Sequence, residues 1–218
     1  MKNNNSKVLF LSLSTLLLYF ILPASRVVNP AYFILGITLF LSFSAFNNDS
    51  IAREYIFDRR AIKENKEYYR FISHGFLHAD VTHLFFNLFS LYSFAPYLYR
   101  ALQNTLPKAG FIFILIYLSS IVISSLFDYI NKRGDYYALG ASGAISSIIS
   151  IVVVLFPELK LGIIFLPIMV PGPLFLALFM GLSYYLSKGN SRIGHMAHLS
   201  GAVYGLFIGF LIKILLTF

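Results

Sequence analysis

The chain is organised around the stretch Gly140-Ala141-Ser142-Gly143, where a polar loop becomes the apolar helix predicted for residues 141–156. Small neighbours leave the Ser142 hydroxyl sterically open, and its backbone N–H is one of the unpaired donors of a first helical turn. A hydroxyl beside such donors suits attack on an acyl carbon and stabilisation of the resulting oxyanion. A serine here can also serve only as a helix cap or a small packing residue, so this motif alone is weak.

The composition is typical of a membrane protein. Of the 218 residues 58% are hydrophobic and 12% are charged, which is too apolar for an average soluble domain. Without cysteine the chain has no disulfide, no thiolate zinc site and no cysteine nucleophile. The net charge of +8 lies mostly in predicted loops and suits contact with anionic lipid headgroups. No basic stripe with interleaved aromatic residues indicates nucleic acid.

Apolar segments predict an all-α bundle of membrane-spanning helices. A first segment over residues 8–22 fits a signal peptide, an anchor or a first span, and we favour a retained span. Residues 1–28 are then an extra N-terminal helix and residues 29–218 the main domain. Charged residues alternate from Asn47 to Arg70, which predicts an extramembrane loop with surface helix. Pro167 and Pro171-Gly172-Pro173 predict a loop through about Pro173. The remaining spans are expected at residues 31–46, 76–99, 110–127, 141–156, 174–186 and 194–216.

The order of these spans brings polar residues together. The helices expected to begin near residues 76, 141 and 194 are separated each time by one further span, so all three enter the membrane from the same side. His83 with Asn87, Ser142, and His198 then lie in the first turns of three parallel helices. We expect them to meet in one cavity.

His198 is the candidate general base, because an imidazole can accept the serine proton near neutral pH. Gly201, Gly205 and Gly209 follow it at four-residue spacing and would let a neighbouring helix approach closely. If that neighbour carries Ser142, the serine and the histidine come within reach. A hydrogen-bonded interior histidine without catalytic role is the alternative.

Other histidines lie near the start of the helix expected from residue 76. His83 and Asn87 are one turn apart and can donate into a single point, as an oxyanion hole requires, or hydrogen-bond between helices. His74 and His78 are expected nearer the water, either as purely interfacial residues or as residues that organise the entrance. A metal-dependent transporter or hydrolase is a further reading of the five histidines, but no His-Glu-x-x-His motif is present and Asp80 is the nearby carboxylate.

Taken together, these motifs resemble those of the rhomboid intramembrane serine proteases. The resemblance lies in the stretch from Tyr69 to His78 with His83 and Asn87, in Gly140 to Gly143, and in Ala197 to Gly201 with Gly205. It covers the chain from about Ala31 onward and implies a six-helix core, so that residues 8–22 form an additional helix. It implies no metal and no cofactor.

The resemblance also implies residue roles. Ser142 and His198 would form a dyad without a carboxylate; His83, Asn87 and the Ser142 backbone N–H would form the oxyanion hole; Gly201 would allow the close approach. Arg70 matches the family's loop arginine, with Tyr69 in place of the usual tryptophan. Two further departures are Tyr99 in place of a glutamate, and Ser146 in place of a tyrosine that packs against the catalytic histidine.

The implied activity is cleavage of single-pass transmembrane proteins near the membrane surface, with the lipid bilayer as surroundings. The alternative is a catalytically silent relative that binds client transmembrane helices. We expect a bacterial cytoplasmic membrane, with the active site opening to the extracytoplasmic side. The positive-inside rule points the other way, because the serine side carries all but five of the seventeen Lys and Arg, the five being Arg26, Arg100, Lys108, Lys160 and Lys213.

Overall fold

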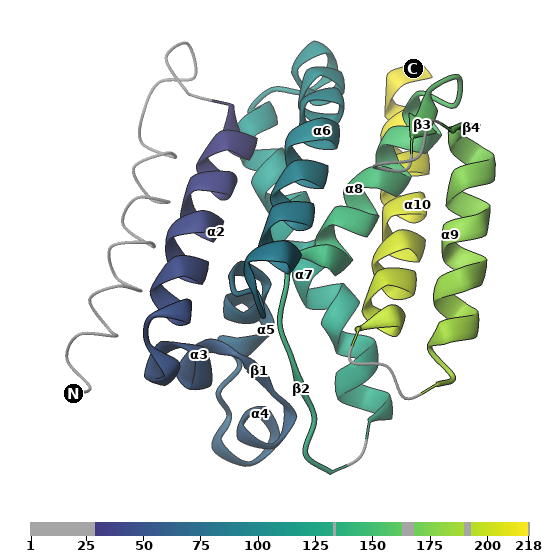
Figure 1. The fold of residues 1–218 in the computed structure, drawn as a ribbon. Coiled ribbons are helices and arrows are strands. Elements are labelled where there is room, and N and C mark those ends of the chain that lie inside the picture. Colours follow the sequence, from purple (N-terminus) through teal and green to yellow (C-terminus); the bar gives the residue numbers. More distant parts are fainter. Residues whose placement is uncertain (1–28, 133, 163–167, 190–192, 218) are drawn as a thin grey trace.

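The computed structural model describes residues 29–132, 134–162, 168–189 and 193–217. The N-terminal helix predicted within residues 1–28 lies outside the described residues. The prediction of an all-α chain is confirmed. The helices are α2 (Pro30–Phe46), α3 (Asp49–Tyr55), α4 (Arg59–Asn65), α5 (Arg70–Ser73) with a 3₁₀ turn (His74–Phe76), α6 (Val81–Thr105), α7 (Ala109–Asn131), α8 (Ser142–Leu155), α9 (Gly172–Leu186) and α10 (His195–Thr217) (Figure 1).

Two short antiparallel strand pairs lie in the loops that connect the helices. β1 (Phe57–Asp58) pairs with β2 (Tyr137–Ala138) and ties the charged loop after α2 to the loop that precedes α8. β3 (Lys160–Gly162) pairs with β4 (Met169–Pro171) between α8 and α9. Sequence analysis did not predict these pairs, because strands of two or three residues are too short to show alternation.

Two helix starts differ from the predicted boundaries. α6 begins at Val81 rather than residue 76, because the Asp80 side chain caps it by accepting a 2.8 Å hydrogen bond from the His83 backbone N–H. The loop predicted through about Pro173 ends slightly earlier than expected, since α9 begins at Gly172. Pro173 lies in the first turn of α9, where a helix needs no N–H donor.

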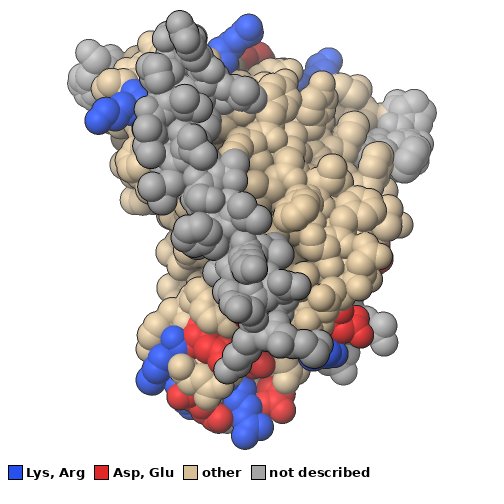
Figure 2. All heavy atoms as spheres, turned by 90° about the vertical axis from the view of Figure 1, so that its left-hand side faces the viewer, with Lys and Arg blue, Asp and Glu red and all other residues tan. Residues whose placement is uncertain are grey.

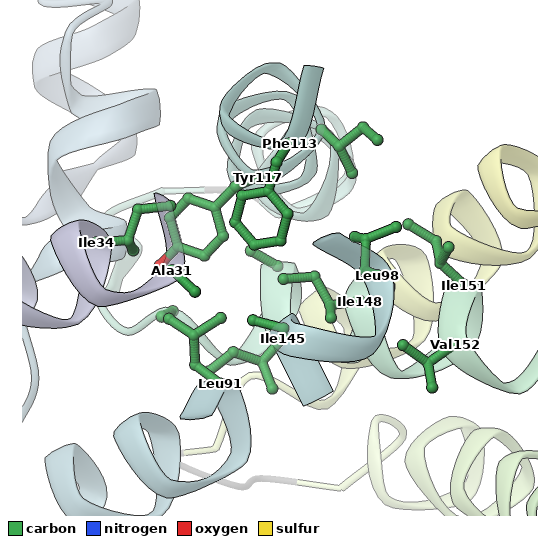
Figure 3. Packing of buried hydrophobic residues seen from close by; sticks show 14 of the residues in the cluster. Ala31, Ile34, Leu91, Leu98, Phe113, Tyr117, Ile145, Ile148, Ile151 and Val152 are labelled. Atoms are coloured by element: carbon green, nitrogen blue, oxygen red, sulfur yellow. The ribbon is translucent and has the colours of Figure 1, made fainter. Parts of the chain in front are cut away.

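The hydrophobic core lies where α2, α6, α7 and α8 meet (Figure 3). α8 lies at the centre of this core and has buried residues on all its sides. This suits its sequence, because isoleucine, valine, small residues and serine occupy every face of the helix. Side chains at three- and four-residue spacing from each helix interlock there, including Ile34, Leu91, Leu98, Phe113, Tyr117, Ile145 and Ile148.

Glycines bring α8 and α10 into direct backbone contact. A Cβ at Gly201 would overlap the carbonyl oxygen of Gly143, and a Cβ at Gly205 would overlap that of Ser147. At Gly209 a Cβ would lie 3.1 Å from the Ile151 Cα. α10 therefore lies against the helix that begins with Ser142 along three of its turns.

Two of the described helices are long and apolar enough to cross a membrane, namely α7 (Ala109–Asn131) and the segment His195–Leu216 of α10. α2, α8 and α9 are apolar but shorter. On the face shown in Figure 2, charged residues gather at the two ends of the molecule, and the described residues between them form an uncharged band. The spanning of a bilayer by six helices stays a prediction.

Candidate active site

A cavity of about 980 Å³ opens at the N-terminal ends of α6, α8 and α10. These helices run in the same direction (Figure 1), so their first turns face one another at one side of the bundle. Ser142, His198, His83 and Asn87 all line this cavity, although up to 115 positions separate them in the chain (His83 to His198). The sequence-predicted residues are therefore brought together.

Ser142 and His198 form a direct hydrogen bond. The distance between the Ser142 Oγ and the His198 Nε2 is 2.7 Å, within the range for a nucleophile and its base. Ser142 is the first residue of α8, whose first-turn N–H groups have no intrahelical acceptor. For Nε2 to accept the serine proton, the imidazole carries its own proton on Nδ1.

His83 lies beside the loop that precedes the serine. Its Nδ1 lies 3.4 Å from the Ala79 backbone N–H, so the proton is assigned to Nε2. Gly140 has a φ of +119°, and a Cβ there would lie 2.8 Å from the His83 Cε1. Only glycine leaves room for the imidazole next to the loop that precedes Ser142.

Asn87 is buried, and one of its two side-chain N–H groups donates a hydrogen bond within α6. The Nδ2 atom donates to the His83 carbonyl oxygen at 2.8 Å, one turn earlier in α6. Its Oδ1 atom is buried without a hydrogen-bond partner among the described residues. The second N–H of the same amide is the donor that remains for a substrate.

His74 and His78 hold the backbone on the N-terminal side of Ser142. The carbonyl oxygen of His74 accepts from the Gly140 N–H at 3.0 Å. The Nε2 of His78 accepts from the Ala141 N–H at 3.4 Å, and its Nδ1 donates to the Ser42 Oγ at 3.0 Å. Burial lowers the pKa of His74 to about 4 and the pKa of His78 to about 3, so both rings are neutral at physiological pH.

Arg70 does not contact the dyad and instead ties the charged loop together. Its Nε donates to the Glu67 Oε2 at 2.6 Å, and its NH1 donates to the carbonyl oxygens of Arg53 and Ile56. The hydrogen bond from Arg70 lowers the pKa of Glu67. The Arg70 carbonyl in turn accepts from the His74 Nδ1 at 2.8 Å, so the arginine supports the histidine that holds Gly140.

The two departures from the family pattern have distinct surroundings. Tyr99 packs in the core, with its ring 6.1 Å from that of Phe113. Ser146 donates its hydroxyl hydrogen to the Ser142 carbonyl oxygen at 2.8 Å and lines the cavity. Among the described residues its hydroxyl makes no hydrogen bond to the His198 ring.

Sequence reasoning missed two residues that line the cavity, Asp128 and Phe179. Asp128 is 3% exposed, and its Oδ2 accepts from the Tyr136 hydroxyl at 2.9 Å. Its place at four-residue spacing after Ser120 and Ser124, on one face of an apolar helix, is a signal that could have found it. Phe179 carries no comparable signal, since it is one apolar residue among many in α9.

Among the described residues, no group of three or more histidines and carboxylates is placed to hold a metal ion. His78 and His83 approach each other with ring centroids 4.9 Å apart, as do His195 and His198 at 6.0 Å. These are edge-to-face ring contacts.

Known proteins resemble this chain. Residues 65–214 match the family model of the Rhomboid domain. The Bacillus subtilis (strain 168) protein named "Putative rhomboid protease YdcA" is 36% identical over 149 residues, which cover 67% of this chain and 68% of that protein. The mitochondrial presenilin-associated rhomboid-like proteins of Rattus norvegicus and Homo sapiens are each 34% identical over 136 residues. Those residues cover 60% of this chain and 34% of each relative, so the chain spans about a third of their length.

Proposed function

The chain belongs to the rhomboid family, and from this premise we propose that it is an intramembrane serine endopeptidase. The observation that carries the proposal is the 2.7 Å hydrogen bond between the Ser142 Oγ and the His198 Nε2. It joins residues 56 positions apart, inside a cavity that also holds further hydrogen-bond donors. A helix cap or an isolated interior histidine would not require this pairing.

The reaction follows from the arrangement of these groups. The His198 Nε2 takes the proton from Ser142, whose oxygen attacks the scissile carbonyl carbon. The oxyanion receives hydrogen bonds from the Ser142 N–H, the His83 Nε2–H and the free N–H of Asn87. His198 then gives its proton to the leaving amine. Water from the cavity, activated by the same imidazole, hydrolyses the acyl-enzyme and frees Ser142.

The proposed setting is a lipid bilayer spanned by six helices of the main domain, α2, α6, α7, α8, α9 and α10. Rhomboid family proteins are membrane proteins. The two long apolar helices and the uncharged band of Figure 2 support this setting. Residues 1–28 would add a further helix. The cytoplasmic membrane of a bacterium, with the cavity open to the extracytoplasmic side, is the proposed location.

The proposed substrates are single-pass transmembrane proteins. The cavity continues from Ser142 past Ser146 and Ile149, which lie one and two turns deeper in α8. A substrate segment reaching this depth must unwind, because a hydrogen-bonded helix hides its carbonyl groups. We expect small or helix-destabilising residues near the cleavage site.

Labelling with a fluorophosphonate serine probe tests the proposal in detergent-purified protein. Wild type should be labelled, Ser142→Ala should lose all labelling, and His198→Ala should lose nearly all. Ser150→Ala is the matched control, because that hydroxyl only bonds the Ser146 carbonyl of its own helix. No labelling of folded wild-type protein, together with failure to cleave a single-pass substrate in vesicles, would contradict the proposal and favour a client-binding relative.

A further inference from the structure

The imidazole of His198 is hydrogen-bonded at only one of its two nitrogens within the described part of the chain. Its Nε2 faces Ser142, whereas its Nδ1 has no hydrogen-bond partner among the residues that the structure describes. In serine hydrolases with a third residue, a carboxylate on this nitrogen holds the ring in the productive orientation. Asp128 lines the same cavity but bonds Tyr136 instead. The His198 ring also meets two neighbouring rings.

The ring of Phe179 lies over that of His198. Their centroids are 6.1 Å apart and their planes differ by 26°, which is an offset stack. Phe179 is backed by Phe175, whose ring lies 6.3 Å away and is inclined by only 3°. His195 meets His198 edge-on at 6.0 Å. Phe179 thus limits rotation of the imidazole away from Ser142.

Phe179 belongs to α9, a helix with few buried residues. Among the described residues of α9 only Gly172, Leu176 and Ser183 are buried. The neighbouring outward residues Leu178 and Leu182 are 60% and 57% exposed. Phe179 faces the cavity, which it lines together with Leu186 near the end of the helix. The position of α9 therefore determines where the ring against His198 lies.

We propose that Phe179 is a positioning residue for His198, so that alignment of the dyad depends on the packing of α9 against α10. The inference rests on the proposed function of Ser142 and His198. Ser146 of α8 does not hold the His198 ring by a hydrogen bond, since its hydroxyl donates to the Ser142 carbonyl oxygen. In our proposal α9 holds the ring instead.

The labelling rate of a Phe179→Leu variant distinguishes a Phe179 that positions His198 from a Phe179 that only obstructs the cavity. If Phe179 positions His198, Phe179→Leu keeps an apolar side chain but loses the stack, and probe labelling slows about 3- to 10-fold. If Phe179 only obstructs the cavity, the smaller leucine widens the opening and labelling stays the same or becomes faster. With a single-pass substrate, positioning lowers kcat more than it changes KM.

The experiment compares wild type, Phe179→Leu and Phe179→Tyr, with Leu178→Ala as the control on the lipid-facing side of α9. We expect slow labelling in Phe179→Leu, recovery in Phe179→Tyr because the ring is restored, and no change in Leu178→Ala. Labelling of Phe179→Leu at or above the wild-type rate would overturn the inference. An unlabelled wild type would instead count against the proposed function.

A second measurement does not depend on activity. Nuclear magnetic resonance of protein labelled in its five histidines identifies the His198 ring protons by comparison with His198→Ala. Loss of the stacked ring in Phe179→Leu should shift these resonances and leave those of His74 unchanged. Unshifted His198 resonances would show that Phe179 does not pack against the imidazole, and the inference would be wrong.

Discussion

Gly201 of α10 packs directly against the backbone of Gly143 of α8, one residue after Ser142. A Cβ at Gly201 would overlap the carbonyl oxygen of Gly143. Because neither backbone can yield without moving a helix, this contact sets how closely His198 can approach the serine. The 2.7 Å hydrogen bond of the dyad thus depends on the absence of a side chain one turn away.

Gly201→Ala should therefore separate the two helices and the dyad. We expect overpacking to destabilise the fold by about 1–3 kcal/mol and misplacement of His198 to slow probe labelling by about 100-fold. Gly36→Ala is the control, since nothing lies within 4 Å of a Cβ there. It should keep full labelling and gain stability, because alanine is the better helix former. Equal labelling in the two variants would contradict the prediction.

Ser42→Ala should disturb the loop before the nucleophile through His78. The Ser42 hydroxyl accepts from the His78 Nδ1 at 3.0 Å and donates to the Phe76 carbonyl at 3.0 Å, and this fixes the ring that accepts from Ala141. Its loss should cost about 1 kcal/mol of unfolding free energy and slow labelling. Thermal unfolding and labelling rates measure both effects.

The control for that variant is Ser44→Ala, whose exposed hydroxyl bonds only the Phe40 carbonyl of its own helix. It should behave as wild type. If Ser42→Ala loses stability but labels at the wild-type rate, Ser42 is structural and does not position the Ala141 backbone.

His74 should make stability depend on pH. Burial lowers its pKa to about 4, whereas an unfolded histidine has a pKa of about 6.5. Between these values the unfolded chain binds a proton that the folded protein excludes. Its contribution to stability is therefore complete above about pH 6.5 and is lost as the pH falls toward 4.

His74→Asn removes this titration. An asparagine amide can reach the carbonyl four residues earlier, as Asn87 does with His83 at 2.8 Å. Melting temperatures recorded from pH 4.5 to 7.5 should fall less steeply on acidification in His74→Asn than in wild type. Parallel curves would show that another group dominates the pH dependence.

Tyr136→Phe should leave Asp128 without its hydrogen bond. The Oδ2 of Asp128 accepts from the Tyr136 hydroxyl, and its Oδ1 already lacks a partner among the described residues. An unsatisfied buried carboxyl should lower stability by about 1–3 kcal/mol. Tyr137→Phe is the control, because Tyr137 is 55% exposed. Similar melting temperatures for both variants would show that solvent replaces the lost bond.

The sequence by itself determined that the described part of the chain is mainly helical and that four polar residues from three of its helices meet. Hydropathy and the order of the apolar segments predicted that Ser142, His198, His83 and Asn87 meet, and all four line one cavity. The all-α class and the family followed from the same local patterns. These properties are local or depend only on the direction of each helix, so a linear pattern records them.

Only the tertiary structure decided how these groups are supported. The pairing of Phe57 with Ala138, the stacking of Phe179 on His198 and the turn of the Asn87 amide toward His83 all depend on side-chain rotation or on contacts distant in the chain. Nothing in a stretch of apolar residues distinguishes Phe179 from its neighbours. Which phenylalanine touches the base depends on how α9 packs against α10, because a ring contact requires two surfaces that meet only after folding.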